Sequence, residues 1–339
     1  MILVTGGCGY IGSHTLIQLL ENGYEVISLD NNSRSHGWIH QNVEAIANQK
    51  IKRYNLDICD YDALKEVFLN HEITGIIHFA AYKTVPESVQ NPLLYFENNL
   101  MSLINLLKCA TEFKVKNFVF SSSCSVYGNP DELPVTEQTA LKTPESPYAR
   151  TKQMGEAILE DYARARPEAK IALLRYFNPT GAHHSGTIGD LPIGIPDNLV
   201  PYITQTANGT RAKLSVFGND YPTRDGTCVR DYIHVSDIAQ AHVLAINYLQ
   251  NQTQSTCEIF NLGSGIGSTV QEVISAFELV NDLKLPYEVV KRRAGDVIAV
   301  YANNEKAKLM LGWLPQYDLK HMMQTAWKWQ KYLDQRVDA

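Results

Sequence analysis

The glycine-rich stretch "VTGGCGYIGSH" at residues 4–14 is the part of the sequence that most constrains the fold. It fits the spacing G-x-G-x-x-G through Gly7, Gly9 and Gly12, and a wider glycine spacing that begins at Gly6. A short apolar run precedes it and a segment of helical period follows, so the glycines are expected in a tight turn from a strand into a helix. Such a turn lets the pyrophosphate of a dinucleotide approach the helix N-terminus. The stretch therefore predicts a dinucleotide-binding unit at the start of the chain.

The next apolar run ends in Asp30, close to the spacing at which dinucleotide-binding proteins carry the acidic residue for the adenosine ribose. A carboxylate there repels the 2′-phosphate of NADP and so favours NAD, although Arg34 lies near enough to leave NADP open. The backbone N–H groups of Tyr10 and Ile11 are expected to meet the pyrophosphate, because the helix dipole favours anions at that end.

The rest of the chain alternates short apolar runs with longer segments of helical period, which predicts an α/β fold with a doubly wound parallel sheet. We expect strands at residues 2–5, 25–30, 51–57, 75–81, 117–123 and 171–177, and helices at 13–23, 61–71, 103–113 and 147–166. Residues 1–177 are predicted to form an NAD-binding Rossmann domain. Residues 178–339 are predicted to form a smaller mixed α/β substrate domain, with residues 230–249 returning to pack on the first.

Composition excludes several classes of function. The net charge of −6 argues against a protein that binds nucleic acid or an anionic membrane surface, and no apolar run is long enough to span a bilayer. The six cysteines include no C-x-x-C pair, and no signal peptide precedes the first strand, so we expect a cytoplasmic protein with reduced thiols. His183 and His184 are adjacent without a further spaced ligand, and no metal site is expected.

The stretch "SPYARTK" at residues 146–152 places Tyr148 four positions before Lys152. Residues at this spacing share a helix face, and a lysine ammonium beside a phenol lowers the phenol pKa. Tyr148 is therefore expected to act as a base near neutral pH. A solvated Tyr-Lys pair is the alternative. The dinucleotide turn and the hydroxyl cluster "SSSCSVYG" at residues 121–128, at the end of an expected strand, favour the catalytic interpretation.

At this point a family resemblance becomes plain. The stretches "TGGCGYIGSH", "FSSSCSVYG", "SPYARTK", "LRYFNPTGAH" and "GTCVRDYIHVSD" resemble the extended short-chain dehydrogenase/reductase superfamily and, within it, the UDP-glucose 4-epimerase family. The resemblance extends over nearly the whole chain. It implies a homodimer joined by helices that begin near Asn99 and Pro147, with apolar surface for core and partner from Leu103, Leu106, Leu107, Met154, Ile158 and Leu159.

The resemblance also implies a reaction and its catalytic residues. Tyr148 would be the acid/base, Lys152 would tune it and hold the nicotinamide ribose, and Ser123 would bridge to the sugar 4-hydroxyl. The reaction would be the interconversion of UDP-galactose and UDP-glucose. The sugar would be oxidised at C4 on bound NAD to a 4-keto sugar, rotate within the pocket and be reduced on the opposite face. Action on UDP-N-acetylhexosamines is a further expectation.

The binding residues are likewise implied by the resemblance. The cofactor site would comprise Gly6, Gly9, Tyr10, Ile11, Gly12, Asp30, Asn31, Ser33, Asp57, Ile58, Phe79, Ala80, Ala81, Lys83, Asn98, Ser121, Tyr148, Lys152 and Phe177. The UDP-sugar site would comprise Ser123, Tyr148, Asn178, Asn198, Leu199, Phe217, Arg230, Arg293, Asp296 and Val300. Two arginines suit a diphosphate, because a guanidinium can fork onto its oxygens.

Val300 departs from the family pattern. A tyrosine usually walls the sugar pocket in bacterial members confined to glucose and galactose, whereas here Val300 occupies the aligned position and Tyr301 follows it. If the alignment holds, the sugar pocket is larger. A shift of one residue would instead place Tyr301 in the pocket.

Two rival functions remain open. A nucleotide-sugar 4,6-dehydratase would carry Asp-Glu directly after the active-site hydroxyl, where this chain has Cys124 and Ser125, and Cys124 lacks a paired histidine in the local sequence for a role as nucleophile. A non-catalytic NAD-binding module would need the glycine turn but has no use for Ser123, Tyr148 and Lys152 together.

Overall fold

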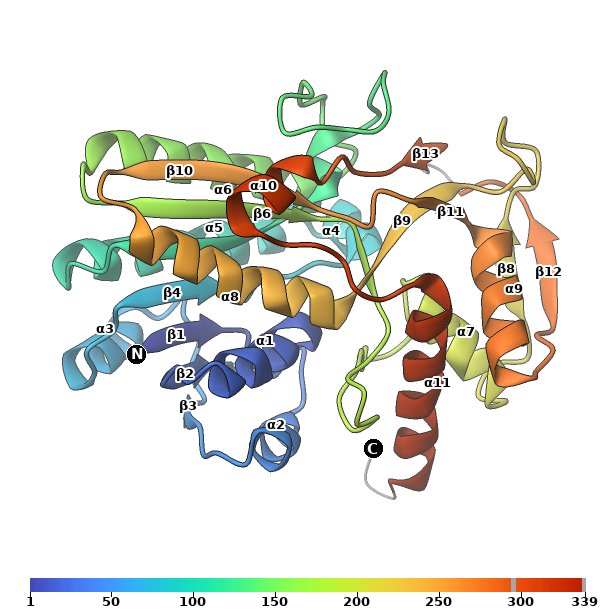
Figure 1. Ribbon diagram of the computed structural model, residues 1–339, viewed down its shortest axis with the longest axis horizontal. Coiled ribbons are helices and arrows are strands. Elements are labelled where there is room, and N and C mark those ends of the chain that lie inside the picture. The colour runs from blue at the N-terminus through green and yellow to red at the C-terminus, as the bar shows by residue number, and fades with distance from the viewer. Residues whose placement is uncertain (294–296, 337–339) are drawn as a thin grey trace.

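The central sheet confirms the α/β prediction. The computed structural model describes residues 1–293 and 297–336. Seven strands form one sheet in the order β10-β6-β5-β4-β1-β2-β3, with every neighbouring pair parallel (Figure 1). The strands are β1 Ile2–Thr5, β2 Val26–Leu29, β3 Lys52–Tyr54, β4 Gly75–His78, β5 Asn117–Ser123, β6 Lys170–Tyr176 and β10 Thr256–Leu262.

Different helices cover the two faces of this sheet, because alternate residues of a strand point to opposite sides. In β1, Ile2 and Val4 belong to one core with residues of α1 (Tyr10–Glu21), α2 (Ile39–Ala47) and α8 (Val235–Asn251). Leu3, between them, belongs to a second core with residues of α3 (Tyr61–Asn70), α5 (Pro92–Glu112) and α6 (Pro147–Ala165). The sheet is therefore buried on both faces, as a doubly wound fold requires.

Element boundaries differ from the sequence prediction where local signals compete. The helix expected at residues 103–113 begins at Pro92, because proline is well suited to the first turn of a helix. The expected strand at 75–81 ends at His78, and a loop leads from it into the short helix α4 (Val85–Gln90). The expected strand at 51–57 covers only Lys52–Tyr54 at the sheet edge.

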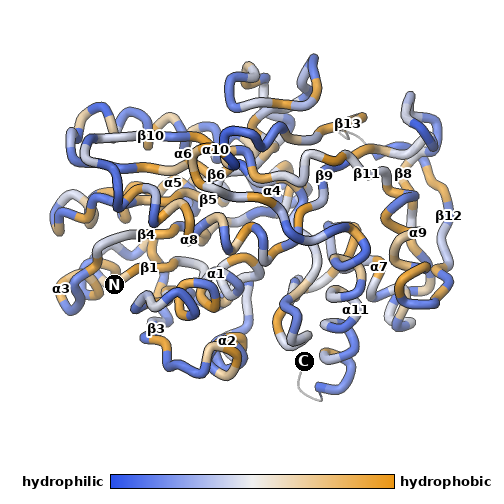
Figure 2. The backbone as a smooth tube through the Cα atoms, in the orientation of Figure 1, coloured by the Kyte–Doolittle hydropathy of each residue, from blue (hydrophilic) through white to orange (hydrophobic). Residues whose placement is uncertain are grey.

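A smaller layer lies beside the carboxyl ends of the main strands (Figure 1). Its largest sheet joins β7 Asn178–Thr180, β9 Val229–His234, β11 Gly267–Thr269 and β13 Ala299–Val300, and a separate parallel pair joins β8 Leu214–Phe217 to β12 Tyr287–Val290. The helices of this layer are α7 Leu199–Ala207, α9 Val270–Asn281 and α11 Leu319–Gln335, and they share a third apolar core. Figure 2 shows hydrophobic and hydrophilic residues alternating along α9 and α11, as expected of helices with one buried face.

Three segments beyond residue 178 lie with the large sheet. α8 packs against α1, and β10 pairs with β6 along its whole length. The last short helix, α10 (Glu305–Leu311), packs on both α8 and β10. The division of the chain at residue 177 and the return of residues 230–249 stay predictions: within that stretch β9 joins the smaller sheet, whereas α8 packs on α1. The pairing of β10 with β6 was not predicted.

Apolar residues on α5 and α6 fall into buried and exposed sets. Leu103, Leu106, Leu107 and Leu159 lie in the core under the sheet, so they do not supply surface for a partner. The exposed apolar residues of these helices are Leu93, Leu94, Met101, Ile104 and Met154. In the part of the chain that the structure describes, no helix combines the length and apolarity needed to cross a bilayer.

Candidate active site at the carboxyl edge of the sheet

The predicted catalytic hydroxyl cluster lies where β5 ends. Ser121, Ser122 and Ser123 close this strand, and the 3₁₀-helix η1 (Cys124–Tyr127) follows directly. Ser123 caps η1 by accepting a hydrogen bond from the backbone N–H of Ser125 at 3.2 Å. Ligands of doubly wound sheets bind at this edge, outside the carboxyl ends of the strands.

Helix α6 brings the predicted tyrosine and lysine to the same edge. The Ser146 side chain caps the helix by accepting from the Ala149 N–H at 3.2 Å, and Pro147 occupies the first turn. The buried Lys152 ammonium donates to the Ser121 carbonyl oxygen at 2.6 Å and lies 5.9 Å from the centroid of the Tyr148 ring. The structure thus brings Ser123, Tyr148 and Lys152 together, as predicted.

Burial dominates the electrostatics of this cluster. It raises the pKa of Tyr148 to about 12, and the hydrogen bond with Ser123 lowers it. Burial also lowers the pKa of Lys152 to about 8, against the charge of Glu156, which raises it. The sequence-based expectation of a lowered tyrosine pKa is therefore wrong for the protein alone. The physical reason is that desolvation disfavours the charged form of both groups at once.

The glycine turn forms a cradle that fits a dinucleotide. Gly6 has a φ of +72°, and a Cβ there would stand 2.9 Å from the Ala80 nitrogen. A Cβ on Gly12 would stand 2.1 Å from the Gly6 carbonyl oxygen. Gly9 is the N-cap of α1 and supplies no side chain to cap it, so the N–H groups around Tyr10 and Ile11 face the space in front of the helix.

Asp30 lies at the end of β2 beside this turn. Its carboxylate accepts hydrogen bonds from the Cys8 N–H at 2.9 Å, the Asn32 N–H at 2.9 Å and the Ser35 hydroxyl at 2.7 Å. Arg34, the residue that left NADP open, is paired with Glu87 of α4 at 2.7 Å and lies 4.9 Å from the Tyr82 ring. These contacts engage the Arg34 guanidinium, and the Asp30 carboxylate repels a 2′-phosphate, so the site fits NAD.

The remaining predicted cofactor residues line the same edge of the sheet. The Asn31 amide donates to Asp57 at 3.1 Å, and the Ser33 hydroxyl donates to Asn31 at 2.7 Å, which ties the ends of β2 and β3 together. Ile58, Ser121 and Phe177 are buried and Lys83 is exposed, whereas Phe79, Ala80, Ala81 and Asn98 are half-buried. Ser121 lies within β5, Asn98 lies on α5, and the others follow strands of the main sheet.

The predicted sugar-nucleotide residues lie on the smaller layer. Asn178 opens β7, and Asn198 and Leu199 stand at the start of α7. Phe217 ends β8 and is exposed, with the Arg293 guanidinium 5.6 Å from its ring centroid. Arg230 of β9 donates to the carbonyl oxygen of Val297 at 2.6 Å. Asp296 lies outside the described residues.

Val300 and Tyr301 point in different directions. Val300 is buried in a cluster with Val126, Tyr127 and Phe177, which continue the chain from β5 and β6. The Tyr301 ring lies instead beside β11, where a Cβ on Gly267 would stand 3.1 Å from it.

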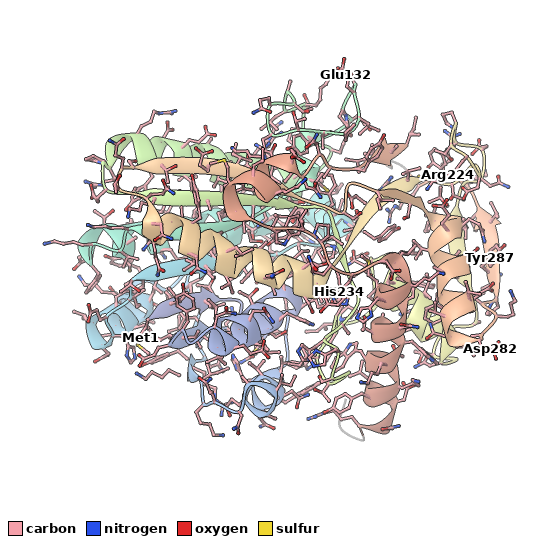
Figure 3. All side chains as sticks on the ribbon, viewed as in Figure 1. Met1, Glu132, Arg224, His234, Asp282 and Tyr287 are labelled. Carbon is pink, nitrogen blue, oxygen red and sulfur yellow. The ribbon has the colours of Figure 1, made fainter. Side chains whose placement is uncertain are left out.

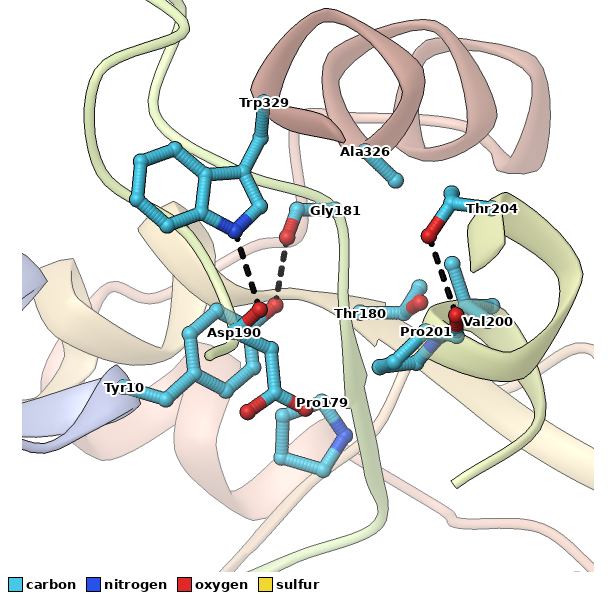
Figure 4. Close-up of a pocket in the computed structure, with 10 residues that line it drawn as sticks. All are labelled: Tyr10, Pro179, Thr180, Gly181, Asp190, Val200, Pro201, Thr204, Ala326 and Trp329. Atoms are coloured by element: carbon cyan, nitrogen blue, oxygen red, sulfur yellow. Dashed lines mark hydrogen bonds between the residues drawn. The ribbon is translucent and has the colours of Figure 1, made fainter. Parts of the chain in front are cut away.

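A small cavity adjoins the substrate side (Figure 4). It measures about 20 Å³ and is lined by residues of α1, β7, α7, α11 and the loop at Asp190. The Tyr10 hydroxyl donates to the Gly181 carbonyl oxygen at 2.6 Å, and the buried Thr180 hydroxyl has no hydrogen-bond partner. The volume suits a water molecule and is far too small for a nucleotide, so we assign the cavity no ligand.

Comparison with known proteins identifies the family. A family model described as GDP-mannose 4,6 dehydratase matches residues 3–326. The UDP-glucose 4-epimerase of Bacillus subtilis is 48% identical over 329 residues, which cover 97% of this chain and 96% of the relative. That of Schizosaccharomyces pombe is 47% identical over 334 residues, covering 97% and 94%. The chain belongs to the UDP-glucose 4-epimerase family.

Solved epimerases share the whole fold. The UDP-glucose 4-epimerase of Stenotrophomonas maltophila, with bound NAD and formylated UDP-arabinopyranose, superposes with a TM-score of 0.96 at 43% identity, over 98% of both chains. The enzyme of Bifidobacterium longum, in complex with NAD⁺ and UDP, gives a TM-score of 0.94 at 44% identity over 98% of both chains. The resemblance stated from the sequence motifs is thus confirmed.

Sequence reasoning missed two sets of residues that support the epimerase site. His40 of α2 lies 3.1 Å from the Cys8 sulfur and 2.7 Å from the Ser28 hydroxyl, which fastens the glycine turn to β2. Glu156, one turn beyond Lys152 on α6, pairs with Arg175 of β6 at 2.6 Å. The four-residue spacing of Tyr148, Lys152 and Glu156 was the available signal for the second set. Across the described residues, no group of three or more His, Cys, Asp or Glu side chains could hold a metal ion.

Proposed function

We propose that this chain interconverts UDP-galactose and UDP-glucose on bound NAD. The observation that carries the proposal is the convergence of Ser123, Tyr148 and Lys152 beside the glycine turn, in a chain of the epimerase family. The relatives compared above are UDP-glucose 4-epimerases, and two of the solved ones hold NAD together with UDP or a UDP-sugar.

When bound, NAD supplies the hydride acceptor for the sugar C4 and a positively charged nicotinamide ring. The chain supplies the proton transfer. Tyr148 is protonated in the protein alone because its pKa is about 12, so it becomes a base only where positive charge is added beside it. The protonated Lys152, fixed to the end of β5, supplies part of that charge, and Ser123 connects the phenol to the sugar hydroxyl.

The binding residues divide between the two parts of the fold. The cofactor pyrophosphate would meet the N-terminus of α1, and Asp30 would accept the adenosine ribose hydroxyls. The uridine diphosphate would meet Asn198, Leu199, Arg230 and Arg293 on the smaller layer, and the sugar would lie between Asn178 and the catalytic hydroxyls. These assignments place the sugar C4 near the edge at which β5 ends.

The experiment is direct. Purified protein is given UDP-galactose without added NAD, and UDP-glucose is measured in a coupled assay while absorbance is followed at the reduced-nicotinamide band. We expect product, no net consumption of NAD and a transient rise in absorbance. Protein that retains NAD but converts neither sugar would contradict the proposal in favour of a non-catalytic NAD-binding module.

The assay must also distinguish the proposed epimerase from a 4,6-dehydratase. The residues after Ser123 are Cys124 and Ser125, and burial raises the pKa of the Cys124 thiol to about 12, so this position offers neither a carboxylate nor a thiolate for elimination. A 4-keto-6-deoxy product in the same assay would reverse this conclusion.

We further propose action on UDP-N-acetylhexosamines. Val300 is buried against Phe177 and Val126 at the catalytic edge, and valine lacks the ring that would exclude an acetamido group at C2. The Campylobacter jejuni UDP-Glc/GlcNAc 4-epimerase, 38% identical with a TM-score of 0.85, shows that the shared fold accommodates such an enzyme.

A cytoplasmic homodimer completes the proposal. Leu93 is 79% exposed and Met101 is 43% exposed on α5, and Met154 is 39% exposed on the adjoining α6. Apolar residues exposed on two packed helices suit burial against a second copy. Six free cysteines with no disulfide among them fit a reducing compartment.

A further inference from the structure

Glu156 extends the catalytic face of α6. It stands four residues beyond Lys152, which stands four residues beyond Tyr148, so the three side chains share one face of the helix. Its side chain and that of Arg175 are each 3% exposed. A carboxylate this deeply buried is retained only where its charge is compensated.

The Glu156 carboxylate binds the two strands that end at the site. One oxygen accepts from Arg175 Nη2 at 2.6 Å, and the other accepts from Arg175 Nε at 2.9 Å and from the Ser122 hydroxyl at 2.5 Å. Ser122 lies on β5 between Ser121, whose carbonyl holds Lys152, and Ser123. Arg175 is its direct partner in the β5–β6 register.

We propose that Glu156, fixed by Arg175, is a positioning residue that keeps Lys152 protonated and holds α6 against the ends of β5 and β6. This inference rests on the proposed function, because it assigns a role beside the residues that the reaction uses. A carboxylate one turn away favours the ammonium form of a lysine that burial would otherwise neutralise. Glu156 itself acts through Lys152 and touches neither substrate nor cofactor.

The other titratable groups around Lys152 do not supply the negative charge that the Glu156 carboxylate supplies. His78 of β4 is kept neutral by burial, which lowers its pKa to about 3. Burial raises the pKa of Tyr148 and of Tyr176 on β6, so both phenols are uncharged in the protein alone. Arg175 carries a positive charge, but both of its donors on this side are directed at Glu156. The charge of Glu156 is the influence that raises the Lys152 pKa.

The test compares Glu156→Gln, the double variant Glu156→Gln/Arg175→Met and the control Glu160→Gln, which removes a carboxylate one further turn along α6. For each holoenzyme, kcat with UDP-galactose is measured from neutral to alkaline pH. The affinity for NAD⁺ is followed over the same range by tryptophan fluorescence, and thermal unfolding is recorded. The binding readout needs no turnover, so it decides the inference even if wild-type protein fails to epimerise the sugar.

In Glu156→Gln we expect the alkaline limb of kcat, and the pH at which NAD⁺ binding weakens, to move down by about one pH unit. The melting temperature should fall, because the buried Arg175 guanidinium loses the negative charge that compensates its own. The double variant should recover most of the melting temperature while both pH dependences stay displaced, and Glu160→Gln should match wild type. The inference is wrong if the pH dependence of NAD⁺ binding is unshifted in Glu156→Gln. It is also wrong if the double variant regains the wild-type pH dependence together with stability. Either result would mean that Glu156 has only a structural role.

Discussion

The ammonium group of Lys152 donates a hydrogen bond to the carbonyl oxygen of Ser121 at 2.6 Å, two residues before Ser123, whose hydroxyl we propose to be catalytic. This contact joins the helix that carries Tyr148 to the strand that carries Ser123. The contact helps to hold the Tyr148 phenol near the Ser123 hydroxyl, so we expect a change at Lys152 to affect turnover.

Replacing Tyr148 with phenylalanine removes one oxygen and leaves the ring in place. We expect the variant to fold and retain NAD but to lose about 10²-fold or more in kcat, because general acid–base catalysis contributes on that order. Activity is measured with UDP-galactose, and cofactor content by absorbance after denaturation. Undiminished turnover would falsify the assigned role.

Replacing Gly12 with alanine should abolish NAD retention, because the added Cβ would stand 2.1 Å from the Gly6 carbonyl oxygen. Gly37→Ala is the matched control, since the nearest atom to its Cβ lies at 3.5 Å. NAD released from the purified variants is measured against protein concentration. Equal cofactor content in the two variants would mean that the turn tolerates side chains and does not form the predicted cradle.

Replacing Val300 with tyrosine should reduce epimerisation of UDP-N-acetylglucosamine while largely sparing UDP-glucose. Size discrimination in apolar pockets amounts to about 1 to 3 kcal/mol, or roughly 10- to 200-fold. The ratio of kcat/KM for the two sugars is the measurement, with Tyr301→Phe as the control for the neighbouring position. If wild-type protein ignores the N-acetylated sugar, the Val300 assignment fails.

Replacing Met101 with glutamate should weaken the proposed dimer, because it places a charge in the exposed apolar surface of α5. Light scattering at micromolar concentration is expected to report a dimer for wild type and a smaller mass for the variant. Leu279→Glu, on α9 and 70% exposed, is the control. A monomeric wild type would remove the basis for the dimer proposal.

Acid should destabilise this protein through its buried histidines. Burial lowers the pKa of His14 and His78 to about 3 and of His183 and His242 to about 4, each from an ordinary value of 6.5. The pKa of His234, which ends β9 and caps α8 beside α11 (Figure 3), is lowered to about 2 by the same cause. Below 6.5 the unfolded chain takes up protons that the folded chain refuses, so stability is complete above that pH and falls as pH decreases.

The loss is at most about 1.4 kcal/mol per histidine per pH unit. Urea unfolding at pH 7 and pH 5 measures it. His242→Met removes one of these titrating groups, so it should lose less stability on acidification than wild type. The substitution breaks few contacts, because the His242 ring is hydrogen bonded only through Nδ1, within its own helix, and its Nε2 has no partner. An identical loss in the variant would assign acid sensitivity to other groups.

The parts of the fold and site that were predictable from sequence are those set by local signals. The glycine turn, the Tyr148–Lys152 spacing and the apolar runs of β1 and β5 are each encoded within a few residues. The Glu156–Arg175 pair joins a helix to the following strand, and although the four-residue spacing places Glu156 on the face of Lys152, that spacing does not identify Arg175 as its buried partner. The sequence-based expectation for the Tyr148 pKa is wrong because the four-residue spacing indicates a neighbouring charge but gives no information on how deeply the phenol is buried.

The position of β10 also bears on how the protein is made. Residues 256–262 complete the large sheet by pairing with β6, and α8 covers α1, so both segments follow the smaller layer's first strands along the chain. When the first 177 residues have left the ribosome, β6 still presents an unpaired edge and α1 an uncovered apolar face. The large sheet can therefore close only after β10 (Thr256–Leu262) has been translated, about a further quarter of the 339-residue chain, and during that interval we expect the nascent Rossmann half to depend on chaperones.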